Sequence, residues 1–232
     1  MKEIISRYLR AGPWVVIDEC LYAMRNKWAP RCYNPSKPAK YGANIKCLND
    51  CEWTYTYRME LFCGKPEIID EVNGYYCSTT YGLTVRLLEK YGWRNLKGCN
   101  LTTDNLYTSL PLLETLEEKQ MTFLGTMRSN RLGVAKEMKS TDGREDKSVV
   151  VWFEKVKGRI SLTSYVRKTK SKGWKAILLL SNLLEFAAMG VTKDDGQFKT
   201  ALNKLYDYLK CGTDVSGKCN IYVLCFFNLF SF

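Results

Sequence analysis

Two aspartates stand where apolar segments meet polar ones, a position at which carboxylates often act in α/β proteins. Asp18 lies within WVVIDECLYAM, an apolar segment rich in β-forming residues. Asp104 follows the short apolar stretch of GCNLTTD and precedes the amphipathic segment SLPLLETLEEKQ. Carboxylate oxygens are the ligands that magnesium prefers. Two such ions can activate an attacking oxygen and stabilise a leaving oxygen in phosphodiester chemistry. These residue types therefore allow metal-dependent chemistry on a phosphodiester.

Each aspartate also has a simpler interpretation. An aspartate after a strand commonly caps a helix or forms a turn. Asp18, within an apolar run, could be a buried acid paired with a lysine or arginine. We expect its neighbour Glu19 to pack or pair locally, and we do not assign Glu19 to a metal.

The composition excludes several classes of site. The chain has 232 residues, of which 46% are hydrophobic and 13% aromatic, so it can form a real core. It contains no histidine, which rules out Ser-His-Asp and Cys-His mechanisms and zinc sites that use histidine. Its ten cysteines include no CxxC pair, which disfavours a four-cysteine zinc site. The N-terminal MKEIISRYLR lacks the apolar core of a signal peptide, so we expect most cysteines to be reduced.

The charge distribution favours an anionic partner such as nucleic acid. The net charge is +11, and residues 128–175 contain 14 lysines and arginines against 5 acids. The segment RKTKSKGWK could contact phosphates while Trp174 stacks on a base, although a solvated loop is the alternative. KPAKYG offers two more lysines close to the first strand. The predicted nucleic-acid contacts from these two segments are Lys37, Lys40, Arg167, Lys168, Lys170 and Lys172.

The hydrophobic pattern predicts a mixed α/β protein, with a sheet flanked by helices. We expect Ser109 to cap the helix over 109–120, with Pro111 in its first turn. We expect a β-hairpin with Gly158 near its turn, a polar loop over 190–197, and no run of the ~20 apolar residues that a membrane span needs. The predicted strands are 14–24, 44–48, 54–63, 98–104, 121–127, 148–156, 159–166 and 176–182, and the predicted helices are 78–92, 109–120 and 201–214.

Four motifs in order, IDE, SKPAKYG, TDNLYTS and GTMRSNR, closely resemble the catalytic domain of the piggyBac transposase family. The resemblance runs from about Ser6 to Lys218. It implies an RNase H-like mixed α/β sheet flanked by helices, with an inserted β-rich basic segment. On this basis residues 1–127 are the first part of the catalytic domain, 128–182 the insertion, 183–218 the last part and 219–232 an apolar tail.

The same resemblance implies a site and its partners. Asp18, Asp104 and Asp214 match the three catalytic aspartates, which would hold two Mg²⁺ or Mn²⁺ ions for cut-and-paste DNA transposition. Arg128 and Arg131 of GTMRSNR join the predicted DNA contacts. The implied partners are DNA and a second copy of the chain, with no membrane, and the implied location is the nucleus.

The chain also departs from the family pattern. Gly217 stands where members usually carry a further acid, three residues after the third aspartate. We expect this chain to lack the family's upstream dimerisation region and its cysteine-rich zinc-binding domain. We therefore expect a truncated form with weak or no activity. Its tail would be a readthrough product, a packed element or a docking segment. The alternatives are a non-catalytic DNA-binding or interaction module and an unrelated α/β domain with a basic face.

Overall fold

The computed structural model contains two compact units, and each is described by itself. Residues 1–99 and 210–232 form the first unit, and residues 100–209 form the second. The structure describes residues 10–27, 31–35, 40–53, 55–62, 80–131, 133–156, 158–169, 173–189, 191–194 and 197–211.

The first unit contains an antiparallel sheet centred on one strand, β3. Strand β1 pairs with β3 over nine residue pairs, and both β2 and β4 also pair with β3. Helix α2 packs against β4, and α3 follows it. The described elements are β1 (Trp14–Ala23), β2 (Cys32–Tyr33), β3 (Tyr41–Asp50), β4 (Thr56–Phe62), α2 (Thr80–Tyr91) and α3 (Trp93–Leu96).

A buried acid, Asp50, ties the start of β1 to the end of β3. Its side chain is fully buried. It accepts hydrogen bonds from the Tyr57 hydroxyl at 2.6 Å and from the backbone N–H groups of Gly12, Glu52 and Trp53 at 3.2, 2.7 and 2.8 Å. Because a buried charge is costly unless it is hydrogen-bonded, these donors allow the acid to sit in the core. Burial, together with the bond to Asp50, raises the pKa of Tyr57.

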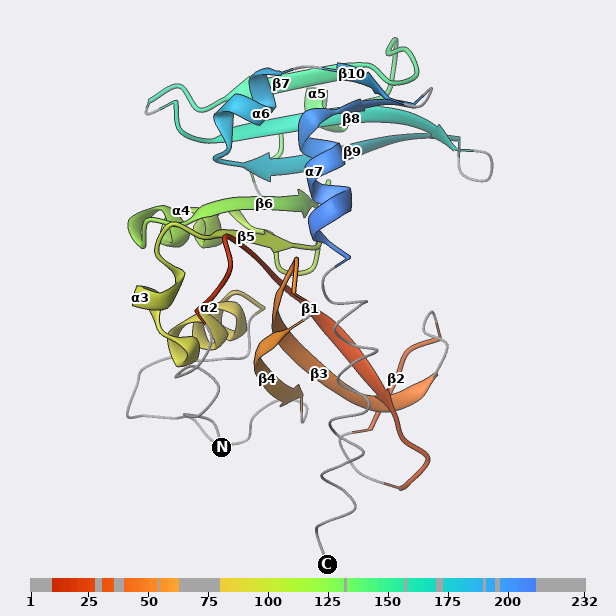
Figure 1. Ribbon diagram of the computed structural model, residues 1–232. Helices are drawn as coiled ribbons and strands as arrows, with labels where there is room; N and C mark the ends of the chain where they lie inside the picture. The colour runs from red at the N-terminus through yellow and green to blue at the C-terminus, as the bar shows by residue number, and fades with distance from the viewer. Residues whose placement is uncertain are drawn as a thin grey trace, which may run out of the picture. The chain divides into compact units, whose positions relative to one another are not determined.

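The second unit begins with a parallel pair of strands and continues as an antiparallel sheet (Figure 1). Strands β5 and β6 are parallel and are joined through α4, and the sheet then runs β6, β9, β8, β7. Strands β10 and β11 form a separate hairpin. The elements are β5 (Asn100–Thr103), α4 (Leu110–Glu118), β6 (Thr122–Met127), α5 (Lys136–Lys139), β7 (Val149–Phe153), β8 (Ser161–Thr169), β9 (Gly173–Ser181), α6 (Leu184–Ala188), β10 (Val191–Asp194), β11 (Gln197–Thr200) and α7 (Ala201–Leu209).

Helices cover both faces of the sheet in the second unit (Figure 1). On one face, the Ser164 hydroxyl of β8 donates a hydrogen bond to the carbonyl of Met138 in α5 at 2.8 Å. On the other face, the hydroxyls of Thr126 in β6 and Tyr206 in α7 lie 3.2 Å apart. Because residues alternate between faces along a strand, Phe123 and Gly125 lie on the face opposite to Thr126. The mixed α/β fold predicted from the sequence is therefore confirmed.

Most predicted elements are confirmed, and one prediction is wrong. The Ser109 hydroxyl caps α4 by accepting the Leu112 N–H at 3.4 Å, and Gly158 lies between β7 and β8 with φ of 62°. A polar loop was expected over 190–197, but the described residues of this range, 191–194 and 197, belong to the paired strands β10 and β11. The polar composition suggested a loop, but backbone hydrogen bonds between the paired strands do not require apolar side chains.

The sequence pattern did not reveal β2, α3, α5 and α6, which have only two to five residues each. Such short elements carry too few residues for a periodic pattern. In the described part of the chain, no helix combines the length and apolar character needed to cross a membrane.

Candidate active site

Asp18 lies in the middle of β1 in the first unit. The three residues before it, Val15, Val16 and Ile17, are at most 2% exposed, whereas Asp18 is half-buried. Its Oδ1 accepts the backbone N–H of Glu19 at 2.7 Å, and Cys47 is its partner across β3. The strand thus fixes a carboxylate at the point where β1 passes from the core toward solvent.

Glu19 faces the other way and is already engaged. Lys46, its partner across β3, is 8% exposed at the side chain and forms an ion pair with the Glu19 carboxylate. Next across the sheet is Glu60, which pairs with Arg86 and Lys90 of α2. Glu19 is therefore paired with a neighbouring side chain, as predicted, although that neighbour is 27 positions away in the chain. This row of charges lies on the face of the sheet opposite to Asp18.

Asp104 directly follows β5 in the second unit and begins a tight turn. Its Oδ1 accepts the Leu106 N–H at 2.9 Å, and its carbonyl oxygen accepts both the N–H and the hydroxyl of Thr108, at 3.1 and 2.7 Å. Aspartate favours such turns because its side chain can replace a backbone acceptor. The half-buried carboxylate is consequently held by its own turn.

The turn packs on a glycine in the neighbouring strand. The hydroxyls of Thr103 and Thr108 lie 2.8 Å apart, and both are buried. A Cβ added at Gly125 of β6 would overlap the Thr108 hydroxyl and would lie 2.9 Å from that of Thr103. Only glycine therefore lets the Asp104 turn approach β6 this closely.

Two arginines after β6 bind the same turn. Arg128 Nε donates to the Asn105 side chain, and Arg131 Nη2 donates to the Leu106 carbonyl, both at 2.9 Å. Arg131 is half-buried, whereas Arg128 is exposed. The sequence predicted both arginines as DNA contacts, which stays a prediction, and the geometry adds a positioning role. The roles of Asn105, Thr108 and Gly125 were missed, although all three lie in motifs that the sequence analysis had singled out.

The predicted basic segment forms the end of the β8–β9 hairpin. Arg167 lies directly opposite Lys175, and Lys168 lies opposite Trp174. The Lys168 Nζ is 5.6 Å from the centre of the Trp174 ring, and all four residues are exposed. Like charges directly opposite each other destabilise a strand pair, so an anion at this position would relieve the repulsion.

The remaining predicted residues are distributed as follows. Lys40 is exposed and directly precedes β3. Outside the described residues lie Lys37, Lys170, Lys172, Asp214 and Gly217.

The carboxylates present fit a hard cation such as Mg²⁺ or Mn²⁺. Asp18 and Asp104 are both half-buried, and in each the Oδ1 atom is oriented by a backbone N–H. Oxygen donors held in this way suit these ions. Among the described residues, no group of three or more cysteines, aspartates and glutamates lies close enough to hold one ion. The third predicted ligand, Asp214, falls outside that set.

Comparison with known proteins identifies the family. Residues 1–220 match the family model described as Transposase IS4. The chain belongs to this transposase family. No curated protein matches it.

A solved structure shares the fold. The transposase chain is similar to the piggyBac transposase seen by cryo-electron microscopy in a synaptic complex with hairpin DNA, with a TM-score of 0.72 and 26% sequence identity. The match covers 91% of this chain and 41% of the piggyBac chain, so the chain spans about two fifths of that protein. The resemblance to piggyBac transposases is confirmed, and this chain is a piggyBac-like transposase domain.

Proposed function

We propose that this domain binds DNA and cleaves its phosphodiester backbone with two divalent metal ions held by Asp18, Asp104 and Asp214. One observation carries the proposal. Asp104 directly follows strand β5 and begins a turn whose backbone donates a hydrogen bond to the Asp104 carboxylate. Two arginines that follow strand β6 donate hydrogen bonds to the same turn. A carboxylate that only capped a helix would not need this support, because Ser109 already caps α4. Such support is typical of a side chain that must hold a metal ion in a fixed position.

Each group has a defined task in this proposal. The ions, when bound, would supply Lewis-acid chemistry at the attacking and leaving oxygens. The chain's own carboxylates at Asp18 and Asp104 would present oriented oxygen donors. The turn bonds would keep the Asp104 donors in place without reorganisation.

DNA is the proposed substrate for two reasons. The solved relative was captured with hairpin DNA, and strands β8 and β9 of this chain carry basic residues at their paired ends. Arg167 and Lys175 would contact backbone phosphates, and Trp174 would stack on an exposed base. Cut-and-paste transposition acts on two DNA ends, so we also propose a homodimer that works in the nucleus.

The test combines metal binding with DNA cleavage. Mn²⁺ titration followed by electron paramagnetic resonance should show binding that Asp104→Asn weakens at least about tenfold, because a charged oxygen ligand is lost. Asp142→Asn is the control, since Asp142 is an exposed loop acid that contacts only Ser140 among the described residues. Nicking of a supercoiled plasmid with Mn²⁺ should be weak, yet above that of an Asp18→Ala, Asp104→Ala double variant.

A non-catalytic DNA-binding module is the second candidate. Gly217 favours it, because family members usually carry an acid at this position. Salt-sensitive DNA binding without Mn²⁺ binding or nicking would support this candidate and overturn the proposed cleavage.

A further inference from the structure

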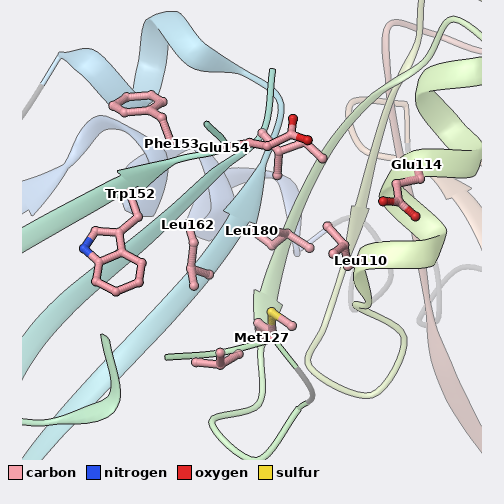
Figure 2. Close-up of a pocket in the computed structure, with 11 residues that line it drawn as sticks. Leu110, Glu114, Met127, Trp152, Phe153, Glu154, Leu162 and Leu180 are labelled. Atoms are coloured by element: carbon pink, nitrogen blue, oxygen red, sulfur yellow. The ribbon is translucent and has the colours of Figure 1, made fainter. Parts of the chain in front are cut away.

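The second unit contains a cavity of about 220 Å³, and Asp104 is not among the residues that line it (Figure 2). Its floor is a row of residues that are direct partners across three strands. Trp152 of β7 lies opposite Leu162 of β8, which lies opposite Leu180 of β9. Helix α4 contributes Leu110 and Glu114 to the wall. A cavity of this size is smaller than the usual pocket for a drug-sized ligand and suits one side chain or one base.

The cavity is lined in part by residues of the edge strand of the sheet. Strand β7 is the last strand of the sheet in this unit, and Trp152 is 43% exposed. A large, partly exposed aromatic ring beside an apolar floor is a common feature of interaction sites.

Glu154 makes the cavity more than an apolar groove. Its Oε2 atom is buried and has no hydrogen-bond partner among the described residues. Its backbone N–H donates to the carbonyl of Ile160 at 2.9 Å, so the chain position is fixed while this carboxylate oxygen is unsatisfied. A buried charged oxygen without a donor is costly, and each such group requires an explanation. A bound ligand that donates a hydrogen bond to this oxygen would explain why it is buried.

The charge around the cavity indicates what that ligand is. Helix α4 contains three glutamates and no lysine or arginine, although the whole chain has a net charge of +11. Glu114 lines the cavity from the helix side, while Glu154 lines it from the strand side (Figure 2). One turn along, Glu117 already binds the guanidinium of Arg159 at 3.2 Å. Both charged residues that line the cavity are therefore acidic, which suits a guanidinium group better than a phosphate.

We infer that this cavity binds the arginine side chain of a protein partner. The aliphatic stem would lie on Leu162 and Leu180, and the guanidinium would donate to the buried oxygen of Glu154. The planar guanidinium carries five donors and packs well on an indole ring, so arginine fits better than lysine beside Trp152. A nucleobase could also stack on Trp152, but its phosphates would approach Glu114 and Glu154.

The experiment uses small probes of the side chain itself. The full chain, labelled with ¹⁵N, is titrated with N-acetyl-argininamide, and the indole N–H signal of Trp152 is followed after assignment with Trp152→Phe. N-acetyl-citrullinamide has nearly the same shape without the charge, and deoxyadenosine tests a nucleobase. Binding of the arginine probe should be about tenfold tighter than binding of the citrulline probe, as expected for a hydrogen bond between charged groups.

Substitutions test whether the Glu154 carboxylate causes the preference for the arginine probe over the citrulline probe. Glu154→Gln keeps the shape of the side chain and should reduce the arginine affinity to that of citrulline. Glu118→Gln removes an exposed acid of the same helix that does not line the cavity, and should leave the affinity unchanged. Circular dichroism of each variant checks folding.

Three results would overturn the inference. These are equal affinities for the arginine and citrulline probes, tighter binding of deoxyadenosine, or no shift of the Trp152 signal with any probe in the millimolar range. None of these measurements depends on DNA cleavage or on metal ions.

Discussion

Arg131 donates a hydrogen bond from its Nη2 atom to the carbonyl of Leu106, 2.9 Å away and two residues after Asp104. The residues are 25 positions apart in the chain, so this bond joins the exit of β6 to the exit of β5. Arg128 donates a second hydrogen bond to the same turn, to the side chain of Asn105. The two motifs TDNLYTS and GTMRSNR are thus one structural feature, in which the second holds the turn of the first.

Removing one arginine should loosen the turn. Arg131→Ala leaves the Leu106 carbonyl without this donor and should lower the free energy of unfolding by about 1–2 kcal/mol, measured by urea denaturation. It should also weaken Mn²⁺ binding, because the Asp104 carboxylate loses its rigid support. Arg159→Ala is the control, since an exposed ion pair contributes at most ~1 kcal/mol. Equal metal affinity in Arg131→Ala and the wild type would show that the arginine has no positioning role.

Gly125 should not tolerate a methyl group. Gly125→Ala places a Cβ against the Thr108 hydroxyl and 2.8 Å from the Phe123 ring, and should destabilise the chain by about 1–3 kcal/mol, as overpacking does. Thermal unfolding measures the loss. In a double-mutant cycle, Thr108→Ala should recover part of it by making room. Purely additive effects of the two substitutions would contradict the close approach of the turn to β6.

The β8–β9 hairpin should determine the salt dependence of DNA binding. Each DNA phosphate that the protein neutralises adds about 0.9 to the steepness of log K plotted against log salt concentration. The double variant Arg167→Gln, Lys175→Gln should lose two phosphate contacts and therefore reduce the steepness of this plot by about 1.8, measured by fluorescence anisotropy with duplex DNA. Lys136→Gln, which removes an exposed charge from α5, serves as the control. Identical slopes in the hairpin variant and the control would place the DNA elsewhere.

Cysteine reactivity should follow burial. Burial, reinforced by Cys20 and Asp18, raises the pKa of the Cys47 thiol to about 12, and burial also raises that of Cys51. The thiolate is the reactive form, so both residues stay protonated and unreactive at pH 8. Among the cysteines that the structure describes, iodoacetamide should modify the exposed Cys211 first, as read by peptide mass spectrometry. Early labelling of Cys47 in folded protein would contradict its placement.

The same shift predicts a loss of stability in alkali. The unfolded chain releases the Cys47 proton near its ordinary pKa of 9.0, while the folded chain keeps it to about 12. The unfolded state therefore binds fewer protons between these values, and the free energy of unfolding falls as pH rises through this window. Cys47→Ala should make that fall less steep in urea titrations between pH 9 and pH 11. An unchanged slope would show that this thiol does not contribute.

Local patterns in the sequence were sufficient for the elements whose signals lie within a few residues. The Ser109 cap, the apolar run that becomes β1 and the glycine between β7 and β8 each depend on neighbours in the chain. Helix capping, strand alternation and turn formation are short-range effects, so these predictions needed no tertiary information. The motif order that identified the transposase family is likewise a property of the sequence alone.

Only the tertiary structure decided which side chains meet. Lys46 as the partner of Glu19, Gly125 beneath Thr108, and Arg131 on the Leu106 carbonyl all join residues distant in the chain. The unsatisfied oxygen of Glu154 is also invisible in the sequence, because burial depends on what other segments cover. Strand register and packing set these contacts, and many sequence patterns are compatible with more than one register until the whole sheet has formed.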